Sequence, residues 1–348
     1  MDHKQRSLQA ILDTLVDGKF FFLTTYAIKK DETVWFGSAG DMSIDQSYFI
    51  ASTTKLFTTA IVLQLRSRGQ LSLDDKISKY LDDSILNGIH VYKKVDYASD
   101  ITIRHLLAHT SGLPDYFQNK GPDGKSLEDE IMSGHDRFWT FEQALEISKA
   151  MRPLFRPGEA GRAHYSDTNF QLLGRIIENI TGKPYVENCE ELIFTPLQLQ
   201  HTYLYQDSAD RNPKNIYYKA NELDIPKAMT SFGPDGGIVS RSSDILVFIE
   251  GFFTGKLFPV EYIEELKQWN RIFFPLQSGV GILRFKLPWI FDPMGVAPEF
   301  IGHSGLSGAL AFYSPADNLY VVGTVNQVAH PDVSFRTMIK LVQQILKK

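Results

Sequence analysis

The chain has 348 residues, of which 43% are hydrophobic and 22% charged, and its formal net charge is -5. This composition predicts one large globular domain or two subdomains with an ample hydrophobic core. The negative charge leaves no basic footprint, so nucleic acid is not an expected partner. A single cysteine, Cys189, excludes a disulfide within the chain, and its acidic neighbours favour a structural thiol.

The beginning of the chain is charged and amphipathic and lacks the features of a secretory signal peptide. The apolar runs FFFL and AIVLQL are far shorter than the roughly 20 residues that span a bilayer, so no transmembrane segment is expected. The sequence as it stands predicts a cytoplasmic protein, with an exported mature form as the open alternative. The oligomeric state is also left open.

The first eighty residues combine helical and strand patterns, read from hydrophobic periodicity and turn residues. The expected elements are a helix at 4–16, strands at 19–29 and 33–38, and a helix at 52–68 that ends at Gly69. Between about residues 85 and 235 strand patterns become rare. Helices are expected there at 102–109, 141–151, 169–180 and 183–196.

Beyond Gly236 and Gly237 the pattern changes again. Helices are expected at 243–253 and 260–269, strands at 279–286, 298–303, 308–314 and 319–326, and a final amphipathic helix at 332–346. The fold class is therefore α+β, with an antiparallel sheet built from both chain ends and flanked by helices. The predicted division is a sheet domain of residues 1–80 and 236–348 and an inserted, mainly helical domain of residues 81–235.

The segment FIASTTKLFTTAIVLQL places Ser52 and Lys55 three residues apart, on one face of the expected helix. A serine hydroxyl is a weak nucleophile until a neighbouring base takes its proton, and a desolvated lysine can be neutral enough to do so. The amide of Ser52 at the helix start would favour a developing oxyanion. The structural alternative is an N-cap serine with a surface lysine, which the almost wholly apolar helix makes less attractive.

Two further segments carry candidate groups. In HYSDTNF, Asp167 or Thr168 is the expected N-cap of a helix starting near Asn169, which leaves Tyr165 on a loop where it could act as a base. The alternative is a tyrosine packed at a domain edge. In GHSGLSG, His303 could contact substrate from the edge of a glycine-rich strand, and the alternative is a β-bulge with a surface histidine.

The order Ser-x-x-Lys, Tyr-x-Asp and His-x-Gly resembles the serine β-lactamase and D-Ala-D-Ala peptidase superfamily. The segments ITIRHLLAHTSGLPDY, FRPGEAGRAHYSDTNFQLLGRIIENITGKPY, FGPDGGIVSRSSDILVF and GHSGLSGALAFYSP look like its branch with class C β-lactamases, DD-carboxypeptidases, D-aminopeptidases and family VIII esterases. The resemblance covers about residues 20 to 340. It implies a β-lactamase/transpeptidase-like fold and a serine hydrolase that needs no metal or organic cofactor.

Carried over by position, the resemblance makes Ser52 the acylated nucleophile and lets Lys55 and Tyr165 share the proton transfers. It also implies an oxyanion hole made by the amides of Ser52 and Leu306. The substrate-binding residues that it implies are Asp167, His303, Ser304 and Gly305.

Two positions depart from the family pattern. Asp167 stands where the family usually has asparagine, and an ionised aspartate can only accept hydrogen bonds, so it could pair with Lys55 and leave the base role to Tyr165. His303 stands where β-lactamases usually have lysine, which weakens attraction for the carboxylate of a penicillin.

The expected function is hydrolysis of an amide or ester by a DD-peptidase-like, D-aminopeptidase-like or broad acyl hydrolase. The alternatives are a family VIII-type carboxylesterase, a class C-like β-lactamase of weak activity, or a non-catalytic binding protein. The expected partners are small-molecule or peptide acyl substrates, with β-lactams among the candidates.

Two competing motifs are weaker. His105 and His109 have a metal-ligand spacing on a helix, but no glutamate base lies between them and no third ligand is evident. Residues 305–309 approximate a G-x-S-x-G nucleophile elbow centred on Ser307, yet the sequence that follows continues as a strand. Structural roles are therefore expected for both.

Overall fold

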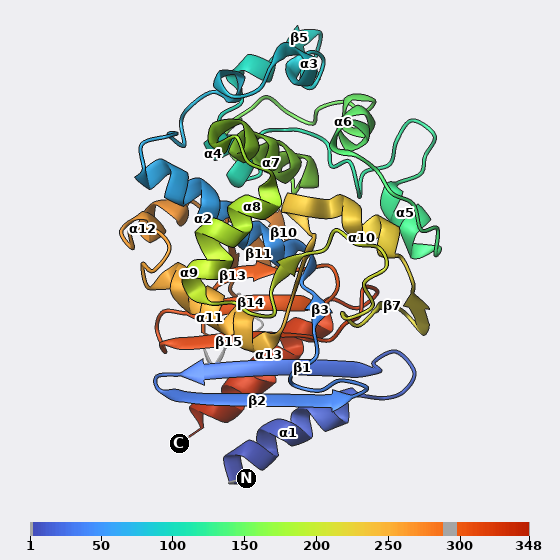
Figure 1. The fold of residues 1–348 in the computed structure, drawn as a ribbon, viewed down its shortest axis with the longest axis vertical. Coiled ribbons are helices and arrows are strands. Elements are labelled where there is room, and N and C mark those ends of the chain that lie inside the picture. Colours follow the sequence, from blue (N-terminus) through green and yellow to red (C-terminus); the bar gives the residue numbers. More distant parts are fainter. Residues whose placement is uncertain (1–2, 288–297, 348) are drawn as a thin grey trace.

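The computed structural model describes residues 3–287 and 298–347 (Figure 1). An antiparallel sheet with the strand order β10-β11-β12-β13-β14-β15-β1-β2 forms its base. The strands are β1 (Leu23–Lys30), β2 (Thr33–Gly40), β10 (Asn270–Phe273), β11 (Leu276–Ser278), β12 (Leu283–Phe285), β13 (Phe300–Ser304), β14 (Ala309–Ser314) and β15 (Leu319–Thr324). In the pairing of β1 with β15, Thr25 lies opposite Thr324. The two chain ends therefore share one sheet, which confirms the predicted α+β class.

Helices cover both faces of this sheet. Helices α1 (His3–Leu15) and α13 (Asp332–Leu346) pack on one face, and α11 (Ser242–Phe253) packs on the other (Figure 1). Strand β15 is buried along its whole length because its side chains alternate between the two covered faces. Leu319 and Val321 join the buried cluster under α1 and α13, whereas Tyr320 and Val322 join the cluster on the α11 side.

Helix α2 (Thr54–Ser67) runs through the middle of the molecule, in contact with α7 (Asp167–Thr181) and β13. Its residues from Thr54 to Leu65 are all buried, in agreement with the predicted apolar helix. The predicted start was wrong in detail. Residues Ala51–Thr53 form a 3₁₀ turn, and Ala51 has a positive φ of 47°, a conformation unfavourable for a residue with a Cβ. A strained backbone therefore precedes Ser52.

The region between β2 and β10, which contains α2, α7 and α11, holds further helices. Its other helices are α3 (Asp83–Leu86), α4 (Ile103–Leu107), α5 (Leu127–Met132), α6 (Phe141–Lys149), α8 (Tyr185–Cys189), α9 (Thr195–Leu197), α10 (Pro226–Phe232) and α12 (Tyr262–Leu266). A π-helical turn at Glu190–Phe194 joins α8 to α9.

Short strands that the sequence pattern did not reveal also lie in this region. They are β3 (Tyr48–Phe49), β4 (Val91–Tyr92), β5 (Val95–Asp96), β6 (Tyr203–Leu204), β7 (Ile216–Tyr218), β8 (Asn221–Leu223) and β9 (Ile238–Ser240). Strands β3, β9 and β6 form a separate sheet.

The first strand begins later than predicted, at Leu23 rather than at residue 19. The carboxylate of Asp17 accepts hydrogen bonds from the backbone amides of residues 19, 20 and 21, which holds this stretch in a turn. The predicted domain boundaries stay a prediction. One buried cluster contains residues from both proposed parts, including Ile61, Leu173 and Ile301.

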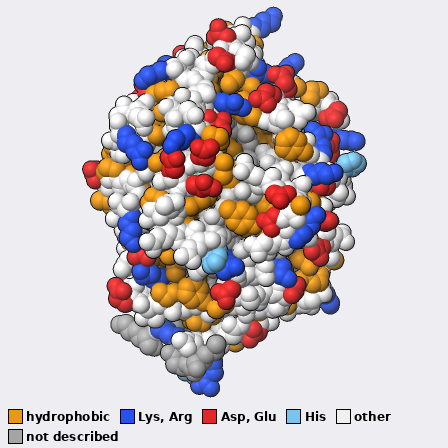
Figure 2. Space-filling view, in the orientation of Figure 1, with side chains coloured by type: hydrophobic (Ala, Val, Ile, Leu, Met, Phe, Trp, Pro, Cys, Tyr) orange, Lys and Arg blue, Asp and Glu red, His pale blue; other side chains and the backbone are white. Residues whose placement is uncertain are grey.

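The surface carries both signs of charge. On the face drawn in Figure 2, lysine and arginine side chains are interspersed with aspartate and glutamate side chains. Within residues 3–287 and 298–347, no helix is both long enough and apolar enough to cross a membrane.

Candidate active site

Ser52 and Lys55 are in direct contact. The 3₁₀ turn places Ser52 immediately before α2, and Lys55 lies in the first turn of that helix. The Lys55 ammonium is fully buried, and its Nζ donates a hydrogen bond of 2.9 Å to Ser52 Oγ. The predicted proximity of hydroxyl and amine is therefore present in the fold.

The surroundings of Lys55 hold it in its charged form. Besides Ser52, Nζ donates to the backbone carbonyl of Asp235 at 2.6 Å and lies 2.7 Å from Oδ1 of Asp167. The Lys55 ammonium thus makes two hydrogen bonds and one ion pair. Burial alone would lower the pKa of Lys55, but the charge of Asp167, followed by Tyr165 and Asp235, outweighs burial and raises it. The neutral lysine suggested by the sequence is thus disfavoured, and the alternative pairing with Asp167 is the one observed.

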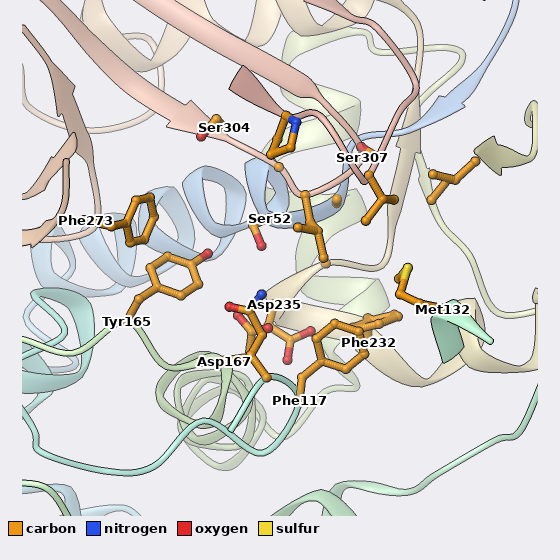
Figure 3. Close-up of a pocket in the computed structure, with 18 of the residues that line it drawn as sticks. Ser52, Phe117, Met132, Tyr165, Asp167, Phe232, Asp235, Phe273, Ser304 and Ser307 are labelled. Carbon is orange, nitrogen blue, oxygen red and sulfur yellow. The ribbon is translucent and has the colours of Figure 1, made fainter. Parts of the chain in front are cut away.

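Tyr165 lies on the loop before α7, with its hydroxyl directed toward Ser52 (Figure 3). Its ring stacks on His109, with centroids 4.4 Å apart, and Lys55 Nζ lies 5.1 Å from the Tyr165 ring centroid. Burial raises the pKa of Tyr165, the charge of Lys55 opposes that increase, and the charge of Asp167 adds to it. The three residues assigned to catalysis from the sequence therefore meet at one place.

The N-cap predicted for α7 was one or two residues too late. Ser166 occupies the N-cap position without a side-chain capping bond, and Asp167 is the first helical residue. The hydroxyl of Thr168 instead donates to the carbonyl of Pro114 and accepts from the amide of Tyr116. This arrangement leaves the Asp167 carboxylate free to face Lys55 rather than to cap its own helix.

Two more buried aspartates surround this lysine. Asp235 ends the 3₁₀ turn Gly233–Asp235 between α10 and β9, and its Oδ2 accepts from Tyr116 Oη at 2.8 Å and from Gln171 Nε2 at 3.0 Å. Asp115 lies close enough to interact electrostatically with Asp167 and Lys55. Burial, followed by the negative charge of Asp167, raises the pKa of both Asp115 and Asp235 well above the usual value.

The sequence analysis did not single out Asp235. The available signal was an acidic residue directly before the glycine pair of FGPDGG, in a loop where a glycine-rich backbone permits close approach.

The turn between β13 and β14 is pressed against the loop that holds Ser52. A Cβ on Gly305 would lie 2.5 Å from the carbonyl oxygen of Ile50 and 3.1 Å from the amide nitrogen of Ser52, so no side chain fits there. Ser307 Oγ donates to the carbonyl of Phe49 at 3.0 Å, which ties the turn to β3. The turn thereby brings Leu306 to the pocket beside Ser52. An oxyanion hole made by the amides of Ser52 and Leu306 stays a prediction that this placement favours.

His303 lies behind the pocket rather than in its wall. It is 2% exposed, and its Nδ1 is 2.7 Å from the carbonyl oxygen of Ser304. Burial and then the charge of Lys55 lower the pKa of His303 to about 3, so the ring is neutral. Ser304 and Gly305 do line the pocket. A direct contact between His303 and substrate is therefore not favoured by the geometry, and its role stays a prediction.

Both competing motifs have structural roles. His105 closes the capping box of α4, whereas the ring of His109 stacks on Tyr165, and the described residues include no cluster suited to hold a metal. Ser307 is followed by β14 and not by a helix, so residues 305–309 do not form a nucleophile elbow.

A cavity of about 290 Å³ opens over Ser52 (Figure 3). Its walls are largely apolar and come from both parts of the fold. Phe117, Met132 and Phe232 stand on one side, and Phe273 stands beside Tyr165 on the other. Asp167 and Asp235 also line the cavity, and its described lining contains no lysine or arginine.

Comparison with known proteins places the chain in a family. The model of the Beta-lactamase family matches residues 9–345. The chain belongs to this family. The resemblance first seen in the short motifs therefore extends over nearly the whole chain, and the β-lactamase/transpeptidase-like fold is confirmed.

Among curated relatives in this family, a putative D-alanyl-D-alanine carboxypeptidase of Escherichia coli (strain K12) is 27% identical, over 82% of this chain and 70% of its own length. Penicillin-binding protein 4* of Bacillus subtilis (strain 168) is 26% identical, over 87% of this chain and 67% of its own length. The chain spans only 57% of another relative, the putative penicillin-binding protein PbpX of that Bacillus strain, which is 24% identical over 73% of this chain.

Solved structures share the fold. A D-stereospecific amidohydrolase from Streptomyces sp. is 26% identical, with a TM-score of 0.77 and coverage of 94% of this chain and 95% of its own. A D-amino acid amidase from Ochrobactrum anthropi SV3 has a TM-score of 0.81 over 99% of both chains. At 22% identity, the amidase supports the fold alone.

Proposed function

We propose that this member of the Beta-lactamase family is a serine hydrolase that forms an acyl-enzyme on Ser52 and cleaves an amide or ester. The observation that carries the proposal is the buried Lys55 ammonium donating to Ser52 Oγ at 2.9 Å, at the floor of a cavity that Tyr165 also lines. A nucleophile, a cation and a proton acceptor that meet in one cavity match the requirements of covalent acyl transfer.

Ser52 Oγ would attack the carbonyl carbon while its proton passes to Tyr165, because the ammonium of Lys55, paired with Asp167, has no lone pair to accept it. The Lys55 charge would favour the phenolate of Tyr165. The backbone amides of Ser52 and Leu306 would stabilise the oxyanion. Tyr165 would then pass the proton taken from Ser52 to the leaving group as the bond to that group breaks. Attack by water, with the proton transfers reversed, would release the acyl group and restore Ser52.

The cavity favours an apolar acyl group without a carboxylate. Aromatic and aliphatic side chains make up most of its wall, and the charged side chains that line it within the described residues are all aspartates. Among the lining residues that the structure describes, a substrate carboxylate would find no cation, and the nearby Lys55 is already paired with Asp167. This argues for amidase-like or esterase-like substrates over β-lactams and peptides that end in D-alanine. The D-stereospecific amidohydrolase neighbour points in the same direction.

The test is covalent labelling with a fluorophosphonate, combined with hydrolysis of a panel of p-nitrophenyl esters, amino-acid p-nitroanilides, nitrocefin and D-alanyl peptides. We expect one adduct, located on Ser52 by mass spectrometry, and faster turnover of the uncharged esters and anilides than of nitrocefin. Ser52→Ala should lose both labelling and turnover. Equal labelling of Ser52→Ala, or turnover within tenfold of wild type, would assign the protein to the non-catalytic alternative or to another nucleophile.

A further inference from the structure

Asp235 leaves one carboxylate oxygen unused at the floor of the cavity. The side chain is 1% exposed and lines the cavity next to Asp167 (Figure 3). Its Oδ2 accepts from Tyr116 and Gln171, but its Oδ1 has no hydrogen-bond partner among the described residues. An unpaired buried polar atom costs about 1–3 kcal/mol, so a fold that keeps one beside a nucleophile has a reason to do so.

The local charge balance indicates what would pair with this oxygen. Asp167 and Asp235 face the cavity, and the only cation among the described residues in contact with them is Lys55. The ammonium of Lys55 contacts Ser52 Oγ, the Asp167 carboxylate and the backbone carbonyl of Asp235, and it makes no hydrogen bond to Asp235 Oδ1. When both carboxylates are ionised, the single positive charge of Lys55 therefore balances only one of them.

We propose that Asp235, assisted by Asp167, forms a subsite for a substrate ammonium beside Ser52. This inference rests on the proposed acyl-transfer function and names its substrate class: acyl donors with a free amino group close to the scissile carbonyl, such as amides or esters of apolar amino acids. Ser52, Asp167 and Asp235 line the same cavity, and Lys55 contacts Ser52 Oγ, the Asp167 carboxylate and the backbone carbonyl of Asp235, so the subsite adjoins the nucleophile. An amino group on the carbon next to the carbonyl is two bonds from the atom attacked, which suits this spacing.

The raised pKa of Asp235 agrees with this assignment. Burial and the charge of Asp167 favour a proton on the carboxyl group when the cavity holds no cation. A bound ammonium would supply the missing positive charge and restore the carboxylate. A metal ion is a poorer occupant, because the described residues contain no group of ligands that could hold one. The remaining rival is a neutral, protonated Asp235 that donates a hydrogen bond to an uncharged substrate.

Binding to the Ser52→Ala protein separates these possibilities without relying on turnover. The probes are 2-phenylethylamine and 2-phenylethanol, which share shape and aromatic group but differ in charge, and calorimetry at pH 7 measures their dissociation constants. A charge-assisted hydrogen bond should make the amine bind about tenfold to a hundredfold more tightly. Equal affinities would overturn the ammonium subsite and favour the protonated Asp235.

Asp235→Asn preserves shape and the acceptor for Tyr116 and Gln171 but removes the charge. In this variant the preference for the amine should fall to within about threefold. Asp332→Asn is the matched control: Asp332 also lines the cavity, but it is 65% exposed and already paired with Arg336. That control should keep the full preference. Unchanged amine affinity in Asp235→Asn would contradict the proposal even if every other result held.

Turnover gives a second readout. Phenylalanine p-nitroanilide, in both enantiomers, should exceed 3-phenylpropanoyl p-nitroanilide in kcat/KM on wild type by about tenfold or more, and Asp235→Asn should remove that ratio. A wild type that hydrolyses both acyl groups equally would refute the subsite and leave the proposed hydrolase intact. A protein that binds the amine selectively but is never labelled at Ser52 would refute the hydrolase and leave the ammonium site.

Discussion

At the scale of single residues, the proposed mechanism depends most on Tyr165 as the base. With Lys55 saturated, Tyr165 is the remaining base beside Ser52, so Tyr165→Phe should reduce kcat by on the order of 10²–10⁴ while KM changes little. The matched control is Tyr185→Phe, since Tyr185 is a buried tyrosine whose hydroxyl hydrogen bond is to Thr58, outside the cavity lining. Stopped-flow acylation with a p-nitrophenyl ester measures both variants. Comparable losses in the two would remove Tyr165 from the proton transfer.

The pH dependence follows from the directions of the pKa shifts. The pKa values of both Lys55 and Tyr165 are raised, so the basic form of either group is scarce near neutrality. Activity requires that basic form, hence kcat/KM should still be rising between pH 7 and 9, by up to about tenfold per unit. A profile that reaches its plateau below pH 7 would contradict this assignment of the base.

Asp167→Asn tests the cause of that profile. The Asp167 charge raises the pKa of both Lys55 and Tyr165, so its removal lowers both. The rising limb of kcat/KM should therefore move to lower pH, and because an amide has nearly the shape of a carboxylate, folding should be retained. Asp332→Asn, an exposed carboxylate at the same cavity, should leave the limb in place. A rising limb that moves to higher pH in Asp167→Asn would contradict the inference that the Asp167 charge raises the pKa values of Lys55 and Tyr165.

At the scale of elements, the β13–β14 turn positions the nucleophile. In Gly305→Ala the new Cβ would meet backbone atoms of Ile50 and Ser52, which cannot move aside as a flexible side chain can. Overpacking of this kind costs about 1–3 kcal/mol, and a displaced nucleophile can lose about a hundredfold in rate. In Gly121→Ala, the nearest atom is the end of the Asp123 side chain, so that variant should behave as wild type. Thermal melts and ester hydrolysis would expose the difference, and an active, stable Gly305→Ala would refute the close packing.

The elements of the fold differ in how well the sequence predicts them. Periodicity located α2 and strands β13 to β15 because their apolar residues repeat at helical and strand spacing. It could not locate short strands such as β3 and β9, which are defined by pairing between residues about 190 positions apart, Tyr48 with Ser240 for example. The motif residues Ser52, Lys55 and Tyr165 were found because each motif is local in the sequence. Asp235 was missed because its significance lies in burial beside Lys55, a contact between distant segments.

At the scale of the whole molecule, the buried aspartates connect stability with function. One hydrophobic cluster joins the sheet and the helical region, and the cavity opens where the two meet. Charged groups at such a place are expensive to bury, and Lys55 compensates only part of the negative charge around it. The site is therefore expected to be a source of instability in the protein without substrate.

The melting temperature of Asp235→Asn, compared with wild type, tests this expected instability. The pKa of Asp235 is raised in the folded state, so the native protein holds this proton to a higher pH than the unfolded chain does. Its effect on stability is absent at low pH, where both states are protonated, and it destabilises the fold increasingly as pH rises above the unfolded value. Asp235→Asn should therefore match wild type in melting temperature near pH 4 and exceed it by a few degrees at pH 7 to 8. Melting temperatures that differ equally at all pH values would mean that shape, and not ionisation, separates the two proteins.

A melting temperature of Asp235→Asn that exceeds wild type only at high pH, together with lost selectivity for amines, would connect the two properties. It would mean that the protein is less stable because it keeps a carboxylate available for a cationic substrate.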